Sequence, residues 1–473
     1  MESTQLKNYL DQVWDLLETD LREENRRTLK SNDPETIKKA LSFTLPEQNE
    51  PLAQILEEFK HQLLPYLNHN TSPNYGAYIT GSGNKIGALA EFIKAYYNQN
   101  ALKWNNSPIA SELEQLVIKW IASFCLVPNH SKGVLTSGGS MSNLMAIHFA
   151  LASKYPEREV EGVKMLPKLT IYCSDQTHSS VDRAMVFLGL GRNYLRKIPV
   201  NDQYQINTKD LIHTIKIDLS NGFRPFLLIG NAGTTNTGSI DPLNELSKVA
   251  EAYELWYHID GAYGLPAVRL DSLKDQFCGL EKADSVIINP HKWMYVPFEA
   301  SCVLVRKIPQ AIHFSPDYLF TEHPSTRWES SNHTIELSKE FRALKIWFTM
   351  KYYGANQLTK FVDQDIRLVS YLAKLLKQHP SISVEPSHPL SILCFRYFNP
   401  ALEEMENERI NIQAIRIIEF DGRIFITGTK LKGKTHLRVY FGNPERTKKD
   451  VDFMVKVIGE IFEKCEVENY RTM

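Results

Sequence analysis

The sequence contains no closely spaced pair of cysteines. Its six cysteines stand at positions 125, 173, 278, 302, 394 and 465, without a Cys-x-x-Cys motif. The usual spacing of a zinc site is therefore absent. Several cysteines have apolar neighbours, as in IYC at 171–173 and SCVLV at 301–305. We expect reduced, buried thiols, no metal site and a cytoplasmic location.

Long apolar runs and a strong net charge are also lacking. The first 25 residues, MESTQLKNYLDQVWDLLETDLREEN, carry acids and no long apolar stretch, so no signal peptide is expected. No later segment is apolar enough to predict a membrane span. A formal charge of −1 gives no general attraction to nucleic acid or to an anionic membrane. Neither is expected as a partner.

The sequence contains several apolar runs that have the length of a β-strand. With 473 residues, 43% of them hydrophobic, the chain can bury a large core. Between about 85 and 310, helix-length segments separate the runs at 133–137, 169–174, 225–233, 255–262, 284–289 and 301–306. Strands this apolar predict an α/β fold with a mainly parallel sheet covered on both faces.

Three further regions flank this pattern. Apolar residues at helical spacing between Leu6 and Leu17 predict an N-terminal helix with an apolar stripe that must pack on something. Residues 312–336 are polar and aperiodic, which predicts a long loop, and a helix follows from 338 to 353. Short strands such as SILCFRY and HLRVYF predict a smaller C-terminal α+β lobe. The expected divisions are an N-terminal helical segment 1–80, a large domain 81–355 and a small domain 356–473.

Glycine-rich and polar residues follow the apolar runs, where ligands gather in parallel sheets. In TSGGSMSNLMAIHFA (136–150) a Gly-Gly turn precedes a helix that begins near Ser140. Backbone N–H groups and the helix N-terminus would suit a phosphate there, although a tight turn needs the same residues. TGSGNKIG at 80–87 fits neither the P-loop nor the dinucleotide-binding pattern.

Three charged or titratable residues stand at such strand ends. His178 in SDQTHSS is either a packing or capping residue or a partner for a flat ring. Asp260 ends the apolar strand WYHID, where an unpaired carboxylate is costly, so it either caps the next helix or pairs with a buried cation. Lys292 in VIINPHKW lies among apolar residues, where its stem could pack while its ammonium reaches water.

One cofactor needs all of these groups together. Pyridoxal 5′-phosphate requires N–H donors for its phosphate and an anion for its pyridinium nitrogen. Its aldehyde requires a lysine amine, which is nucleophilic only when neutral, and desolvation favours the neutral form. This requirement explains why a lysine would lie in apolar surroundings at the end of a strand.

The motifs NPHKW, SDQTHSS, HIDGAYG and SPIASELE together resemble those of the group II pyridoxal-phosphate-dependent amino acid decarboxylases. The nearest likeness is to aromatic-L-amino-acid and histidine decarboxylases, over about residues 70–355, and EFRALKIWFTMKYYG at 340–354 strengthens it. The resemblance implies a type I aminotransferase-like fold with a seven-stranded central sheet. It also implies a homodimer with active sites at the interface, whose N-terminal helices wrap the partner subunit.

The resemblance also implies roles for individual residues. Lys292 would join covalently to the cofactor aldehyde and Asp260 would pair with the ring nitrogen. His178 would stack on the ring near the substrate carboxylate. Ala262 would pack against the opposite ring face, and Thr235 would lie beside the ring. The phosphate would be surrounded by Gly139, Ser140, Asn289 and His291. The active-site mouth, which is shared across the dimer interface, would lie near Thr80, Gly81, Ser82 and Trp104.

One departure concerns the product. Family members usually carry a loop tyrosine that protonates the reacting carbon, and some relatives without it yield an aldehyde by oxidative deamination. The equivalent position falls near Ser330, with Trp328, Asn332 and His333 close by, and the nearest tyrosine is Tyr318. Either the loop has a different register or another donor such as His333 serves. Amine and CO2 are the expected products.

The substrate is the least constrained expectation. An aromatic amino acid is expected first, then histidine, then glutamate or diaminobutyrate. An aminotransferase or a cysteine desulfurase would share the lysine and the aspartate, but a decarboxylase releases CO2 without consuming a keto acid. A non-catalytic relative would be expected to lose Lys292 or Asp260, and both are present.

Overall fold

A seven-stranded sheet forms the centre of the large domain. This computed structural model describes residues 3–22, 27–30, 33–130, 132–309, 327–386 and 389–471. The strands are β1 (Lys132–Thr136), β2 (Leu169–Ser174), β3 (Leu195–Ile198), β4 (Arg224–Asn231), β5 (Trp256–Asp260), β6 (Ser285–Ile288) and β7 (Ser301–Val305). Their order is β1-β7-β6-β5-β4-β2-β3, and only β7 runs antiparallel to its neighbours. The predicted mainly parallel sheet is confirmed.

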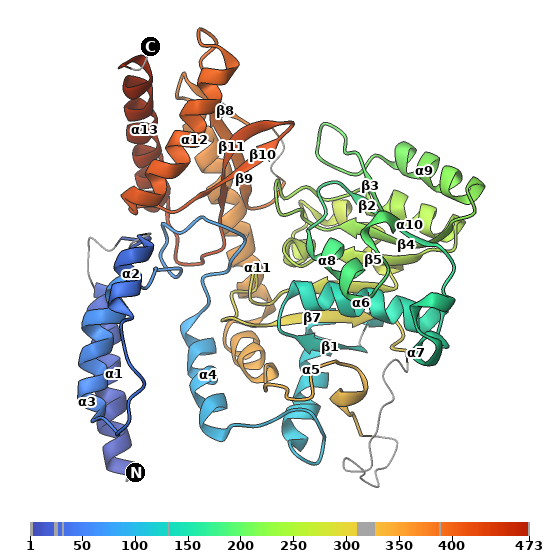
Figure 1. The fold of residues 1–473 in the computed structure, drawn as a ribbon, viewed down its shortest axis with the longest axis horizontal. Helices are drawn as coiled ribbons and strands as arrows, with labels where there is room; N and C mark the ends of the chain where they lie inside the picture. Colours follow the sequence, from blue (N-terminus) through green and yellow to red (C-terminus); the bar gives the residue numbers. More distant parts are fainter. Residues whose placement is uncertain are drawn as a thin grey trace.

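Helices cover both faces of this sheet (Figure 1). On β4, Leu227 and Ile229 pack in the cluster that contains α6 (Gly139–Lys154) and α8 (Ser180–Phe187). Leu228, which points the opposite way, packs in the cluster of α5 (Pro108–Phe124), α9 (Thr208–Ser220) and α10 (Leu243–Ala252). Alternate side chains are thus buried on opposite faces, which explains why the strands are apolar throughout.

A smaller lobe contains a second, antiparallel sheet. Its strands lie in the order β10 (Thr427–Leu431), β11 (Lys434–Tyr440), β9 (Ile392–Tyr397) and β8 (Ile382–Val384), with α12 (Glu404–Asp421) and α13 (Lys448–Arg471) packed on them. Helix α11 (Ala343–Leu376) joins the two parts. It starts later than expected and continues past 353, with a kink at Gly354 (φ 69°), beside the predicted boundary at 355.

The N-terminal helices stand beside the body of the molecule (Figure 1). They are α1 (Ser3–Arg22), α2 (Pro34–Ala40) and α3 (Leu52–Glu58), and α4 (Lys85–Tyr97) follows them. Within the α1 stripe, Trp14 is 60% exposed and Leu17 is 43% exposed. Among the described residues, nothing covers these two side chains fully, and burial of the stripe against a partner subunit stays a prediction.

Part of the N-terminal segment packs on the small lobe of its own chain. Gly76 N–H donates to the Phe425 carbonyl (2.8 Å), and Tyr440 N–H donates to the Gly76 carbonyl (2.9 Å). The fully buried Arg446 guanidinium donates to the carbonyls of Pro73 and Tyr75. Residues 73–76 are thus built into the C-terminal lobe.

The remaining helices are short. They are α7 (Arg158–Glu161), η1 (Phe59–Leu63), η2 (Leu64–Tyr66), η3 (Pro128–His130), η4 (Val163–Met165), η5 (Arg192–Tyr194), η6 (Leu265–Arg269), η7 (Lys274–Phe277), η8 (Leu280–Lys282) and η10 (Ser330–Asn332). Among the described helices, none has the length and apolarity to cross a membrane. Five of the six cysteines are buried as expected, whereas Cys278 is exposed.

Candidate active site

A cavity of about 520 Å³ opens at the carboxyl ends of β4, β5 and β6, beside the start of α6. All nine predicted cofactor-binding residues line it, namely Gly139, Ser140, His178, Thr235, Asp260, Ala262, Asn289, His291 and Lys292. Residues more than 150 positions apart in the sequence therefore meet in one place, as the strand-end argument predicts.

The glycine turn approaches an amide from another strand. A Cβ placed on Gly139 would lie 2.8 Å from Asn289 Nδ2, so a larger residue here would have to displace this amide. Asn289 Oδ1 accepts a hydrogen bond from Ser301 Oγ (2.6 Å), which holds the amide with Nδ2 toward the turn. An amide donor beside a helix N-terminus is a favourable site for an anion, and it fits a phosphate group.

The Asp260 carboxylate is 7% exposed at the end of β5. Its Oδ1 accepts from Ala262 N–H (3.1 Å) and its Oδ2 accepts from Asn143 Nδ2 (2.9 Å). Both of these donors are neutral groups. A buried carboxylate held by neutral donors is suited to a protonated ring nitrogen, so this residue also fits pyridoxal phosphate.

Lys292 follows β6 at the wall of the cavity. Burial lowers the pKa of its ammonium, and the Asp260 carboxylate opposes part of that change. A lowered pKa raises the neutral, nucleophilic fraction of the amine. The expectation that this lysine lies in a desolvated place is confirmed.

Two histidines complete the wall. His178 Nδ1 accepts from Ser180 N–H (3.2 Å) and lies 2.8 Å from Ser180 Oγ, and desolvation lowers the pKa of this ring. His291 Nδ1 accepts from Ala300 N–H (3.0 Å), and its ring lies 4.7 Å from that of Phe298. Burial lowers the pKa of His291 to about 3, so this ring is neutral and keeps its proton on Nε2.

A pH dependence of stability follows from a third histidine. Burial lowers the pKa of His258, on β5, from 6.5 to about 4. Below pH 6.5 the unfolded chain binds a proton at this residue that the folded chain refuses, so the free energy of unfolding falls as pH decreases from 6.5 toward 4. Between pH 6.5 and 5 the loss from this residue is about 2 kcal/mol. In urea unfolding, the free energy of unfolding of wild type should fall by that much more than that of His258→Gln between pH 6.5 and 5. Equal decreases in the two proteins would contradict the lowered pKa of His258.

The four residues predicted at the mouth do not line this cavity. Gly81 and Ser82 line a separate pocket of about 630 Å³ that also contains Phe298. Trp104 Nε1 donates to Glu112 (2.8 Å), and the Arg327 guanidinium lies over the Trp104 ring, 4.3 Å from its centroid. Thr80 lines neither of these two pockets. A role of Thr80, Gly81, Ser82 and Trp104 across a dimer interface stays a prediction.

Gly81 nevertheless lies against the backbone that carries Lys292. A Cβ at this position would be 2.1 Å from the Lys292 carbonyl oxygen and 2.7 Å from that of His291. Gly81→Ala must push this segment away, at about 1–3 kcal/mol, and we expect loss of both stability and cofactor retention. Gly459→Ala in α13, where an added Cβ meets nothing within 4 Å, is the control. Equal melting temperatures and equal cofactor content for the two variants would show the expectation to be wrong.

Several lining residues were not predicted. They include Ser137, Gly138, Met141, Asn143, Ser180, Asn231, Gly233, Thr234, Tyr263, Phe298 and Glu299. Asn143 had a detectable signal, because an amide inside the apolar helix segment SNLMAIHFA needs a polar partner. Phe298 and Glu299 come from the segment just after Lys292 and had no such signal.

The described loop residues considered in connection with proton donation do not line the cavity. His333 stacks on Trp328, with ring centroids 4.3 Å apart, and Ser330 is fully buried and accepts from Lys339 Nζ (3.2 Å). His333 is not among the residues that line the cavity. Tyr318 lies outside the described residues, so the choice of donor stays a prediction.

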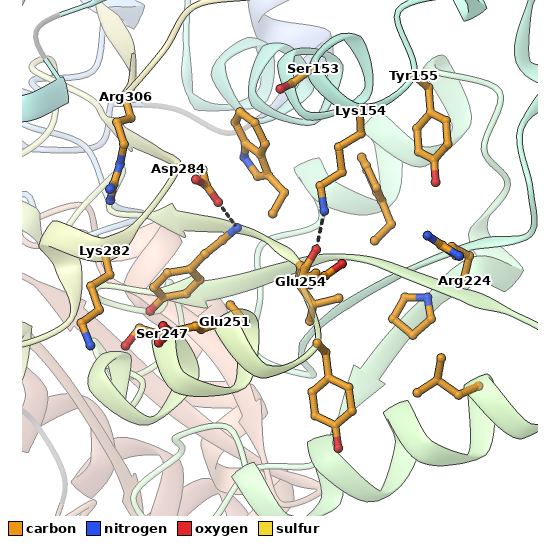
Figure 2. A pocket seen from close by; sticks show the side chains of 18 of the residues that line it. Ser153, Lys154, Tyr155, Arg224, Ser247, Glu251, Glu254, Lys282, Asp284 and Arg306 are labelled. Atoms are coloured by element: carbon orange, nitrogen blue, oxygen red, sulfur yellow. Dashed lines mark hydrogen bonds between the residues drawn. The ribbon is translucent and has the colours of Figure 1, made fainter.

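A larger cleft, of about 1200 Å³, lies at the other end of the sheet (Figure 2). Lys154, at the end of α6, donates to the Glu254 carbonyl there, and the Asp284 carboxylate accepts from Tyr257 N–H (2.8 Å). The amino ends of β4, β5 and β6 form its floor, so it is a strand length away from Lys292. Size alone therefore does not identify the active site here.

Comparisons with known proteins agree with this geometry. The family model for the pyridoxal-dependent decarboxylase conserved domain matches residues 34–398. An aromatic-L-amino-acid decarboxylase of Bacillus atrophaeus is 30% identical over 432 residues, covering 90% of this chain and 88% of that protein. Phenylacetaldehyde synthase of Arabidopsis thaliana is 29% identical over 475 residues, covering 97% and 96%. A crystal structure of Oryza sativa TDC with PLP and tryptamine has a TM-score of 0.92 at 22% identity, covering 98% of this chain and 99% of that one.

Proposed function

Since this chain belongs to the pyridoxal-dependent decarboxylase family, we propose that it converts an aromatic L-amino acid to the corresponding amine and CO2. The protein is an amino acid decarboxylase and its cofactor is pyridoxal 5′-phosphate. The observation that carries the assignment of its site is the convergence of a glycine cradle, a buried carboxylate and a desolvated lysine in one cavity.

The cofactor, when bound, supplies an electron sink for the bond that breaks. The residues of this chain bind the cofactor and orient the substrate. Lys292 would hold the cofactor through its aldehyde, and Asp260 would keep a proton on the ring nitrogen. Gly139, Ser140 and Asn289 hold the phosphate. His178 orients the substrate carboxylate, so that the bond to CO2, rather than the bond to the α-proton, is held in the reactive direction.

An aromatic substrate is supported by the residues at the mouth. The Phe298 side chain is 56% exposed and lines the cavity. Glu299 adds a carboxylate, which would repel an acidic substrate side chain, and it accepts from Arg342 (2.9 Å). Arg342 also pairs with Glu336 (2.8 Å), so this guanidinium is already neutralised and does not call for glutamate. The name of the Bacillus atrophaeus relative points the same way.

A screen of the twenty amino acids for CO2 release tests the proposal. We expect release from phenylalanine, tyrosine or tryptophan, and weaker or no release from histidine, glutamate and diaminobutyrate. Amine, aldehyde and peroxide should be measured in the same reactions. Release from glutamate alone would overturn the aromatic assignment, and activity that depends on an added keto acid would indicate transamination instead.

An aldehyde product is the second candidate. The described residues 327–342 contain no tyrosine, and one relative is a phenylacetaldehyde synthase. If this candidate is correct, the screen will yield aldehyde and peroxide in place of amine. His333→Gln separates the two further, because a proton donor at this position would make the variant form less amine.

We also propose a homodimer in which the α1 stripe packs on the partner subunit. The exposed Leu10, Trp14 and Leu17 support it, since such a stripe normally packs on another apolar surface. Light scattering should give twice the monomer mass, and Trp14→Asp with Leu17→Asp should shift the mass toward the monomer. A cytoplasmic location stays a prediction.

A further inference from the structure

One buried amide on α6 contacts both sides of the candidate site. Asn143 is 2% exposed. Its Nδ2 donates to Asp260 Oδ2 (2.9 Å) and to Ser180 Oγ (2.9 Å), and its Oδ1 lies 3.0 Å from His258 Nε2. An ionised carboxylate only accepts hydrogen bonds, so the NH2 group must face Asp260 and the amide has a single possible orientation.

This orientation fixes the hydrogen bonds on the β5 side. The Asn143 oxygen can only accept, so the His258 proton is on Nε2. His258 Nδ1 then accepts from the Ser285 hydroxyl (2.8 Å), and Ser285 Oγ accepts from Trp256 Nε1–H (2.9 Å). An indole N–H can only donate, so the series of bonds runs in one direction from Trp256 to Asn143. The lowered pKa of His258, about 4, agrees with a neutral ring.

The same orientation fixes the bonds on the α8 side. Ser180 Oγ accepts one N–H of Asn143, so its own proton is available to His178 Nδ1 (2.8 Å). The Ser180 backbone N–H also points at this nitrogen (3.2 Å). Two donors therefore face His178 Nδ1, and a neutral His178 must carry its proton on Nε2.

We propose that Asn143 is a positioning residue that holds the Asp260 carboxylate and, through the Ser180 hydroxyl, reinforces the His178 tautomer that the Ser180 backbone N–H also favours. The inference rests on the proposed roles of His178 and Asp260. A proton on Nε2 makes that nitrogen a donor to the substrate carboxylate. A proton on Nδ1 would leave an Nε2 lone pair there, which repels the carboxylate. One amide thus contacts one proposed catalytic side chain directly and influences a second through Ser180.

Asn143→Leu tests this in the protein as it exists, because leucine has nearly the same volume and no polar atoms. Asn411→Leu is the matched control. Asn411 is also a fully buried helical asparagine, and it bonds the Tyr397 backbone N–H (2.8 Å) and carbonyl (3.0 Å), but in the small lobe. Both variants lose the hydrogen bonds of a buried amide, so both should be less stable, and a purely structural role would affect them equally.

The main readout is the 15N spectrum of the histidine rings, recorded with and without pyridoxal phosphate. His178→Gln and His258→Gln identify the two signals among the 14 histidines. In wild type and Asn411→Leu we expect both rings to carry the proton on Nε2. In Asn143→Leu we expect a mixture of tautomers at His258. At His178 we expect a smaller shift toward protonation of Nδ1, because the Ser180 backbone N–H still faces that nitrogen. We also expect about tenfold weaker cofactor binding, from loss of one hydrogen bond to a charged group, and a fall in kcat larger than the change in KM.

Ser180→Ala gives a second route if Asn143→Leu does not fold. It cuts the connection at the serine hydroxyl, so the His178 signal should change while the His258 signal stays as in wild type. A wild-type His178 protonated on Nδ1 would overturn the proposal. Unchanged ring signals in Asn143→Leu or, where that variant does not fold, in Ser180→Ala would do the same. These results are independent of the proposed function, which fails instead if wild type has the expected tautomer and releases CO2 from no amino acid.

Discussion

Replacing Lys292 with alanine is expected to lower kcat/KM by about 10⁴-fold or more, the scale of effect found when a covalent catalytic group is removed. The side chain lies in a cavity with the other proposed cofactor-binding residues, and burial lowers the pKa of its amine. Borohydride treatment of wild-type protein supplied with pyridoxal phosphate should label the peptide that contains residue 292, and the variant should lose this label.

Lys154→Ala is the matched control for this prediction. Burial also lowers the pKa of Lys154, but this residue lies at the far end of α6, where it donates to the Glu254 carbonyl. We expect normal labelling at 292 and nearly normal turnover. Labelling of Lys154 instead of Lys292, or a Lys292→Ala variant within tenfold of wild type, would refute the assignment.

Asp260→Asn is expected to lower kcat by about 10²–10³-fold, as for other groups that stabilise charge in a transition state. Asparagine has nearly the same shape and can still bond Ala262 N–H, but it carries no charge to keep a proton on the ring nitrogen. Labelling at Lys292 should persist, because the aldehyde and the amine remain. The variant would thus separate cofactor attachment from turnover.

Asp218→Asn provides the comparison for that variant. Asp218 is also a buried carboxylate, and it accepts from Arg196 (2.8 Å) and Tyr172 (2.7 Å), away from the cavity. It should lose stability and keep its turnover per folded molecule. Wild-type kcat for Asp260→Asn, with the Asp218 control behaving as expected, would count against the role of Asp260.

Burial decided which parts of the fold the sequence predicts. The six strands found from their apolar runs are buried on both faces. In contrast, β3 (LRKI) lies at the edge of the sheet and is half-exposed. Its charged residues break the apolar pattern, so the sequence did not predict this strand. The antiparallel direction of β7 had no local signal, because a fully buried strand has the same composition in either direction.

Some residues of the candidate site could also be predicted from the sequence, and others could not. Residues that follow buried strands, such as Asp260 and Lys292, could be placed together because parallel strands end at one edge. Asn143 could not, since its partners on β5 and α8 lie 37 to 117 positions away. Trp104 and the segment 80–82 lie outside the cavity, and a sequence of one chain does not reveal what a second copy would add.

The insertion of residues 73–76 into the C-terminal lobe has a consequence for biosynthesis. Their backbone partners at Phe425 and Tyr440, and the Arg446 side chain, are synthesised some 350 to 370 residues later. The large domain can complete its sheet while the chain is still on the ribosome, but this early segment must wait, with its peptide groups hydrated, until almost the whole polypeptide has emerged. Folding of the second lobe is thus a late event that depends on contacts between residues far apart in the sequence. A chain truncated before residue 440 would lack the Tyr440 N–H that donates to the Gly76 carbonyl.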